Sequence, residues 1–235
     1  MKKVLLLISL FAFCQLFSQK EYSFDYGLIY GFKSKTGKPF SEIYIVNSKK
    51  NNYYLYIHDG DSINSVLHFY DYEGLFVNGK MKDSDAYQSA VYQVNCYEVF
   101  PREDSYKYKK NDYEFKNLND TIINDTSYYH YKIVSLKSLK FQKRKKIETV
   151  HFIVDKVSAF FTPFLWNPTL YEVWKHDKNI PNGYPKIIFK ENFEGKITTV
   201  LTLLSIKKID RKLTIPEECD YTNKKRKYKP LIKGF

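Results

Sequence analysis

Segments in which apolar and polar residues alternate recur along most of this chain, and they constrain its fold more than any other feature. In residues 148–155, Val150, Phe152 and Val154 would lie on one face of a strand and His151 on the other. The 235 residues also include 22 Tyr and 18 Phe, which suit half-buried sheet surfaces. These patterns predict a mainly β protein with antiparallel strands.

Turn residues divide the alternating segments into hairpins. Residues 42–47 and 53–58 flank a polar tip of five residues, and residues 186–193 and 196–209 flank a Glu-Gly turn. The Asn-Gly pair at 78–79 is typical of a two-residue hairpin turn, because both positions tolerate positive φ. We therefore expect consecutive strands to pair with one another.

Two segments favour short helices. Asn167, followed by a proline, forms an N-cap before the first helical position and predicts a helix to about His176. Residues 84–100 fit both helical and strand spacing, and their first half favours a helix. Residues 101–126 are polar and predict a loop, whereas residues 128–141 predict a longer strand.

Residues 1–18 have the order of a secretory signal peptide. Lys2 and Lys3 precede an apolar run that ends at Phe13, and cleavage is expected after Ser18. No later stretch approaches the roughly 20 apolar residues that a membrane helix needs. We therefore expect a secreted or periplasmic protein.

The positions of the three cysteines indicate whether the chain could carry a lipid anchor and whether it could form a disulfide. The large residue before Cys14 disfavours a lipoprotein anchor, because a lipid-modified cysteine normally follows a small residue. Cys96 and Cys219 remain after cleavage and could pair in an oxidising compartment, but their spacing has no signature and leaves the pairing open. We expect residues 19–235 to form a single β-rich domain, with a boundary between sheet halves near 101–126.

The chain is basic, with a formal net charge of +12 that falls to about +10 on cleavage. Positive charge gathers in Lys143, Arg144, Lys145 and Lys146 and in a basic tail at 223–235. The first cluster could make peripheral contact with anionic lipid headgroups or acidic glycans. No signature of a nucleic-acid-binding fold is present, so no nucleic acid partner is expected.

The sequence carries no specific motif of a catalytic, cofactor or metal site. Its five histidines are scattered without the spacing of metal ligands: His58, His68, His130, His151 and His176. We therefore predict no catalytic residue, metal or cofactor. A hydrolase would have to use candidates such as His151 and Asp155, which share one strand face, as polar residues often do by chance.

Residues 159–166 form an aromatic segment broken by a proline, where a regular sheet cannot continue. Such a segment could line or gate a pocket. The candidate ligand-binding residues are Phe160, Phe161, Phe164, Trp166 and Trp174. The alternative is that these rings complete the core beneath a loop.

The order of residues 159–163 (Ala-Phe-Phe-Thr-Pro), 180–185 (Ile-Pro-Asn-Gly-Tyr-Pro) and a following strand resembles the GLPGLI family of secreted Bacteroidetes proteins. The Gly-Leu-Pro-Gly sequence itself is replaced by Asn-Gly-Tyr-Pro. The region of about 147–210 also resembles lipoprotein carriers of the LolA type. The LolA resemblance implies one curved antiparallel sheet or half-barrel with one or two short helices and an apolar cavity. The GLPGLI class has no established activity to carry over.

Three functions follow from these observations. The first is a non-enzymatic envelope protein that binds an apolar or lipid-like ligand against a concave sheet, or other envelope proteins. The alternative is a surface adhesion or glycan-binding module, in which exposed tyrosines lie in a row and stack on sugar rings. The third is a hydrolase whose site is assembled from residues distant in sequence.

Overall fold

The structure is a computed structural model that describes residues 19–33, 40–102 and 107–222. The predicted signal peptide, with its cleavage site and Cys14, and the predicted basic tail lie outside the described residues.

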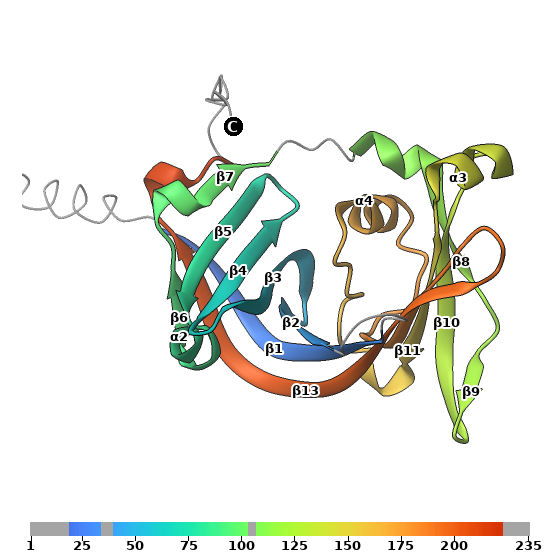
Figure 1. The fold of residues 1–235 in the computed structure, drawn as a ribbon, viewed down its shortest axis with the longest axis horizontal. Coiled ribbons are helices and arrows are strands. Elements are labelled where there is room, and N and C mark those ends of the chain that lie inside the picture. The colour runs from blue at the N-terminus through green and yellow to red at the C-terminus, as the bar shows by residue number, and fades with distance from the viewer. Residues whose placement is uncertain (1–18, 34–39, 103–106, 223–235) are drawn as a thin grey trace, which may run out of the picture.

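In the described part of the chain, thirteen strands form one sheet that is not closed into a barrel (Figure 1). The strands are β1 (Lys20–Lys33), β2 (Phe40–Asn47), β3 (Lys50–Asp61), β4 (Asn64–Asp71), β5 (Leu75–Lys82), β6 (Val91–Gln93), β7 (Val99–Pro101), β8 (Tyr113–Asn117), β9 (Thr121–Ile123), β10 (Thr126–Ser135), β11 (Thr149–Asp155), β12 (Pro185–Glu191) and β13 (Ile197–Ile215). Their order is β7-β5-β4-β3-β2-β1-β13-β12-β11-β10-β8, with β9 on β10 and β6 on β13. Only the short β6–β13 pair is parallel within the described residues.

The described residues include three short α-helices and four 3-10 turns. The helices are α2 (Asp83–Gln88), α3 (Leu139–Lys145) and α4 (Pro168–Asp177), and the 3-10 turns are η1 (Cys96–Glu98), η2 (Lys107–Asp112), η3 (Lys156–Ser158) and η4 (Glu217–Cys219). The prediction of a mainly β fold with one curved antiparallel sheet is confirmed, with three short helices rather than one or two. The predicted helix after Asn167 is confirmed as well, because the Thr169 amide donates to the Asn167 side chain at 2.8 Å.

The two central strands, β1 and β13, give the sheet its curvature (Figure 1). Their pairing shifts register between Phe24 and Tyr26 and again between Ile29 and Tyr30. Such irregularities bend a strand and increase its twist. Further along β1, a Cβ on Gly31 would lie 2.9 Å from the Leu204 side chain, so glycine lets the two strands pack closely at this point.

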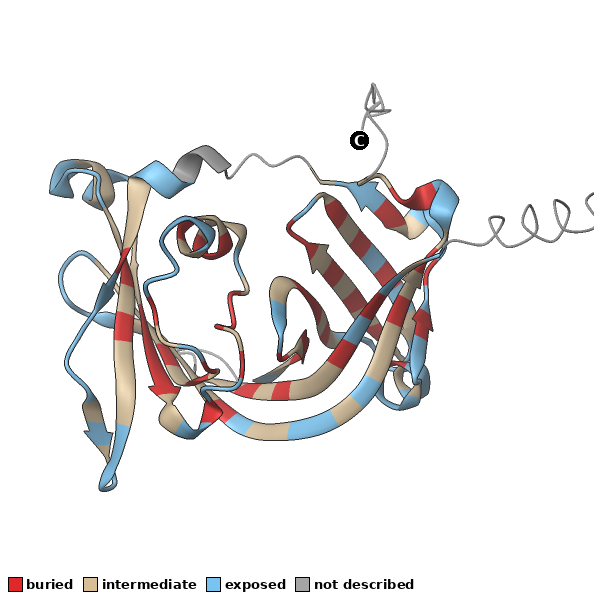
Figure 2. Cartoon of the chain, turned by 180° about the vertical axis from the view of Figure 1, so that it is seen from behind, coloured by how far each residue is buried: buried red, intermediate tan, exposed pale blue. Residues whose placement is uncertain are grey.

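The main core lies in the hollow of the sheet, where α4 and the preceding segment are held against it (Figure 2). Two buried tyrosine hydroxyls hold this segment by its backbone. Tyr54 donates to the Trp166 carbonyl at 2.7 Å, and Tyr72 donates to the Leu165 carbonyl at 2.6 Å. Each bond satisfies a polar group that would be costly to bury alone.

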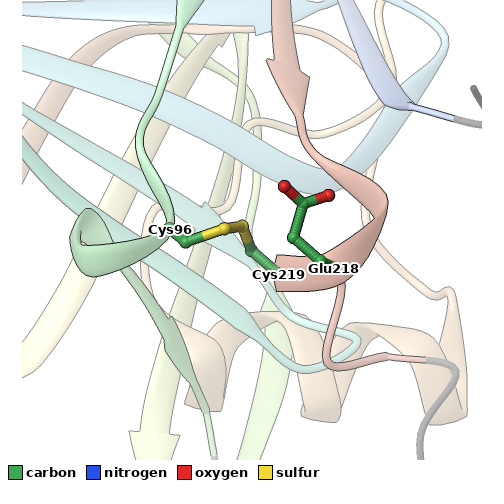
Figure 3. A group of neighbouring side chains, drawn as sticks. All are labelled: Cys96, Glu218 and Cys219. Carbon is green, nitrogen blue, oxygen red and sulfur yellow. A yellow bond between two sulfur atoms is a disulfide. The ribbon is translucent and has the colours of Figure 1, made fainter.

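A second core covers the opposite face of β3, β4 and β5. Tyr54 on β3 belongs to the main core, whereas its neighbour Leu55 is fully buried in the second core. The second core also includes side chains from α2, β6, the end of β13 and η4. Cys96 and Cys219 are bonded at its margin, with their Cα atoms 5.2 Å apart (Figure 3).

Two predicted hairpin tips are wrong in position. Strand β2 ends at Asn47 and β3 begins at Lys50, so the tip has two residues rather than five. The Asn47 side chain closes it by accepting from the amides of Lys49 and Lys50. The Asn-Gly pair at 78–79 lies inside β5, and the turn before β5 instead uses Gly74, whose φ is +135°.

Two other segments also differ from the prediction. The strand predicted for residues 128–141 ends at Ser135, because Ser138 caps helix α3 by accepting from the Phe141 amide. The loop predicted for 101–126 contains β8 and β9, which pair with β10. Alternation in these polar strands is too weak to separate them from a loop.

Candidate functional site

The aromatic segment fills the hollow of the sheet with its own side chains. Phe161 is 2% exposed, and its ring centroid lies 4.5 Å from that of Tyr26. Phe164 is also buried, 5.1 Å from the ring of Tyr44. The cavity beside this pair measures about 10 Å³, which is about the space of one water molecule. Phe161 and Phe164 therefore serve the core in this structure.

The other three candidate residues lie at different places. Phe160 is 52% exposed beside Lys49. Trp174 is half-buried on α4 and packs against Tyr171. Trp166 is half-buried and forms part of a cavity wall.

The cavity beside Trp166 lies among α3, α4 and strands β10–β12 and has a volume of about 350 Å³. Its walls combine apolar side chains with charged groups. The lining residues are Tyr113, Ile133, Lys145, Lys146, Ile147, Glu148, Val150, Trp166, Asn167, Thr169, Leu170 and Lys190. The volume is at the lower end of the range of about 300–1,000 Å³ found for small-molecule sites.

Three lysines and one glutamate line this cavity. Lys145 and Lys146 come from the end of α3, and Lys190 comes from β12. Glu148 accepts a hydrogen bond from the Thr198 hydroxyl at 2.6 Å. The net charge of the lining is therefore positive, which favours an anionic group on any molecule bound there.

The basic cluster 143–146 is divided by the structure. Lys145 and Lys146 line the cavity, whereas the other two cations lie over aromatic rings outside its lining. The Lys143 ammonium is 5.5 Å from the centre of the Phe193 ring. The Arg144 guanidinium is 5.4 Å from that of Phe141. This division supplies a matched pair of variants for a binding experiment.

The fold brings four of the five histidines into two pairs that the linear sequence does not reveal. Nε2 of His58 on β3 is 3.2 Å from Nε2 of His68 on β4. Nε2 of His130 on β10 is 3.0 Å from Nδ1 of His151 on β11. Both pairs are diagonal neighbours across antiparallel strands, so only the strand register could have predicted them.

The pKa of His151 is lowered to about 4, chiefly because burial disfavours its charged form. The Glu191 carboxylate opposes this shift, whereas His130 and Lys132 add to it. In the unfolded chain the pKa of His151 is about 6.5. Between these values the unfolded state binds a proton that the folded state does not, so stability falls as pH drops from about 6.5 towards 4.

We expect the unfolding equilibrium constant to rise by up to about tenfold per pH unit in this window. Urea unfolding between pH 7.5 and 4.5 measures the effect. His151→Gln should have a shallower pH slope than the parent chain. Equal slopes in the two proteins would contradict this assignment.

The candidate hydrolase pair does not assemble. His151 and Asp155 are four residues apart on β11, which places them about 13 Å apart along the strand. The Asp155 carboxylate instead caps η3 by accepting from the Val157 amide at 3.1 Å. His151 meets His130 and Glu191, so no histidine–aspartate couple forms here.

A row of aromatic rings crosses β3, β4, β5 and β7. Tyr54 and Tyr70 stack at 4.9 Å, Tyr70 and Phe76 are 5.1 Å apart, and Phe76 and Phe100 are 6.2 Å apart. Tyr54 is buried, Tyr70 and Phe76 are half-buried and Phe100 is exposed. The exposed end of the row therefore offers aromatic area to a ligand.

No protein-family profile matches this chain, and no curated protein matches it. Among solved structures it is similar to a chain of the MucA/MucB complex of Pseudomonas aeruginosa, at 5% identity and a TM-score of 0.40, covering 78% of this chain and 51% of that one. A MucB structure matches at 8% identity and a TM-score of 0.37, covering 78% and 53%. This chain thus spans about half the length of those proteins.

A LolA superfamily protein from Nitrosomonas europaea matches at 14% identity and a TM-score of 0.28, covering 79% of this chain and 85% of that one. The predicted LolA resemblance thus has a counterpart among solved folds, and the comparisons give none for the GLPGLI family. At these TM-scores the likenesses carry no argument about function. In the described part of the chain, no helix has the length and apolar character to span a membrane.

Proposed function

We propose that this chain is a non-enzymatic protein of the cell envelope that binds a small apolar ligand bearing an acidic group. The observation that supports this most directly is the cavity of about 350 Å³ beside Trp166, whose lining combines apolar side chains with three lysines. Its location outside the cytoplasm rests on the signal peptide expected at residues 1–18.

The two kinds of lining residue have separate roles in this proposal. Trp166, Val150 and Leu170 offer apolar area for a hydrocarbon group, and burying such a group is worth about 25 cal/mol per Å². Lys145 and Lys146 offer ammonium groups for a carboxylate or phosphate. The site therefore favours a short amphiphile over an uncharged hydrocarbon.

Fluorescence titration with dodecanoic acid tests the proposal, because Trp166 reports on a ligand that enters the cavity. We expect saturable binding that weakens about tenfold in a Lys145→Gln, Lys146→Gln, Lys190→Gln triple variant, as for the loss of about 1.4 kcal/mol. The control is Lys143→Gln with Arg144→Gln, which changes the same helix outside the cavity lining.

Equal weakening in both variants would indicate a general effect of net charge. Absence of saturable binding in the parent chain, with dodecanoic acid and with dodecyl phosphate, would contradict the proposal directly. Dodecanol supplies the third ligand of the series, and we expect it to bind more weakly than either acid, because it lacks a charge for the lysines.

The row of aromatic rings favours a second candidate function, the binding of glycans. Phe100 is exposed and Tyr70 and Phe76 are half-buried beside it, so a sugar could stack at this end of the row. Binding of oligosaccharides at this row should be lost in a Tyr70→Ala, Phe100→Ala variant that keeps its affinity for dodecanoic acid. A variant that keeps all oligosaccharide binding would exclude the row as a glycan site.

A further inference from the structure

Two histidines on the paired strands β3 and β4 face each other through the same ring atom, Nε2. Nε2 of His58 lies 3.2 Å from Nε2 of His68, and the two rings are inclined by 23° with centroids 5.2 Å apart. Both side chains are half-buried. Figure 1 shows the two strands side by side in one wing of the sheet.

The hydrogen bond at the other ring nitrogen of His58 sets its tautomer. Nδ1 of His58 is 2.9 Å from the backbone carbonyl of Asp59, an acceptor, so Nδ1 carries the proton and Nε2 carries the lone pair. A metal-binding histidine is commonly held by such a bond from its second nitrogen to a carbonyl. The lone pair of His58 is thus directed at His68.

The rings that flank the pair hold it in place. The Tyr56 ring lies 6.1 Å from that of His68 at an interplanar angle of 13°, and the Phe76 ring lies 5.9 Å from it at 14°. In the metal-free protein, His68 donates its Nε2 proton to the lone pair of His58. A metal ion would take the place of this proton, and the His68 ring would then carry its proton on Nδ1.

We propose that His58 and His68 together bind a divalent late first-row transition metal ion, with water completing its coordination. Two imidazole nitrogens on one tetrahedral zinc ion, each about 2.0–2.1 Å from it, are about 3.3 Å apart, close to the separation in this pair. Imidazole ligands suit Cu²⁺ and Zn²⁺, and Cu²⁺ binds the more tightly of the two.

Two other histidine and cysteine groups are weaker candidates. His151 is only 6% exposed, and its Nδ1 faces Nε2 of His130. A metal ion between these two nitrogens would therefore have little access to water. Among the described residues, Cys96, Cys219 and Glu218 form the one group of three potential ligands, but the two sulfurs are bonded to each other (Figure 3). A disulfide supplies no thiolate.

The experiment uses the full chain without a histidine tag and with Cys14→Ser, so that no thiol competes for metal. After treatment with EDTA, it is titrated at pH 7.5 with Cu²⁺ and, separately, with Zn²⁺. We expect one tight Cu²⁺ equivalent, weakened more than about tenfold in both His58→Gln and His68→Gln. His130→Gln and His176→Gln are the matched controls and should bind as the parent does.

The electron paramagnetic resonance spectrum of the Cu²⁺ complex gives a readout that needs no variant. It should show coupling to two imidazole nitrogens in the parent chain, even if a variant folds poorly. Parent-like affinity in His58→Gln and His68→Gln would overturn the proposal. Loss of the tight equivalent in His130→Gln alone, or a spectrum with one coupled nitrogen, would overturn it as well.

Discussion

Phe161→Ala is expected to lower the free energy of unfolding by about 3–5 kcal/mol, whereas Phe160→Ala should change it by no more than about 0.5 kcal/mol. The two residues are adjacent and chemically identical, but Phe161 is 2% exposed and Phe160 is 52% exposed. Phe161 also contacts the rings of Tyr26 and Tyr184, at 4.5 and 5.0 Å. Its removal would leave a cavity between these two rings.

Urea unfolding followed by circular dichroism gives both free energies, with the slope m as a check that the unfolded states are comparable. The same proteins should be titrated with dodecanoic acid. A folded Phe161→Ala protein of parent-like stability that no longer binds ligand would show instead that this ring belongs to a binding site. The pair of variants thus separates the two roles of the aromatic segment.

Removal of the disulfide, by Cys96→Ala with Cys219→Ala, is expected to lower the free energy of unfolding by about 4 kcal/mol. The bond joins residues 123 positions apart, and in the chain-entropy model a loop of about 100 residues is worth about 4.7 kcal/mol. Its sulfur atoms also belong to the margin of the second core, since Cys219 is fully buried there.

Urea unfolding in the presence and absence of dithiothreitol measures this contribution. Reduction should shift the parent midpoint to that of the double variant, whereas it should leave the variant unchanged. Cys14→Ala is the control for thiol effects outside the pair. A double variant as stable as the oxidised parent would show that the bond does not constrain the unfolded chain.

The sequence predicted the strands of this fold better than their turns. Period-two alternation at 148–155 identified β11 and the face that Val150 and Phe152 present to the main core. The hairpin tip after β2 was missed because one side chain, Asn47, closes a tighter turn than the polar run suggests. The turn predicted at the Asn-Gly pair 78–79 is wrong, because both residues lie within β5 and pair with residues of β4.

The candidate sites could not be predicted from the alternation of apolar and polar residues, because they depend on packing and strand register. Trp166 could be selected as a pocket residue from its place beside a proline, but only the folded structure shows that Lys190 lines the same cavity. The pairing of His58 with His68 required the register of β3 on β4, in which Tyr56 lies opposite His68. One residue of slip would have placed the two rings on opposite faces.

The central pair of strands has a consequence for how the chain would fold during the export that its predicted signal peptide indicates. Lys20 pairs with Ile215, so the middle of the sheet joins residues from opposite ends of the chain. In a protein that enters its compartment amino end first, β1 can pair with β2, but the other edge of β1 stays unpaired until β13 has followed. Because pairing of such distant segments is slow, the emerging chain presents long unpaired β edges. We expect a holding chaperone to be needed until the last strand arrives.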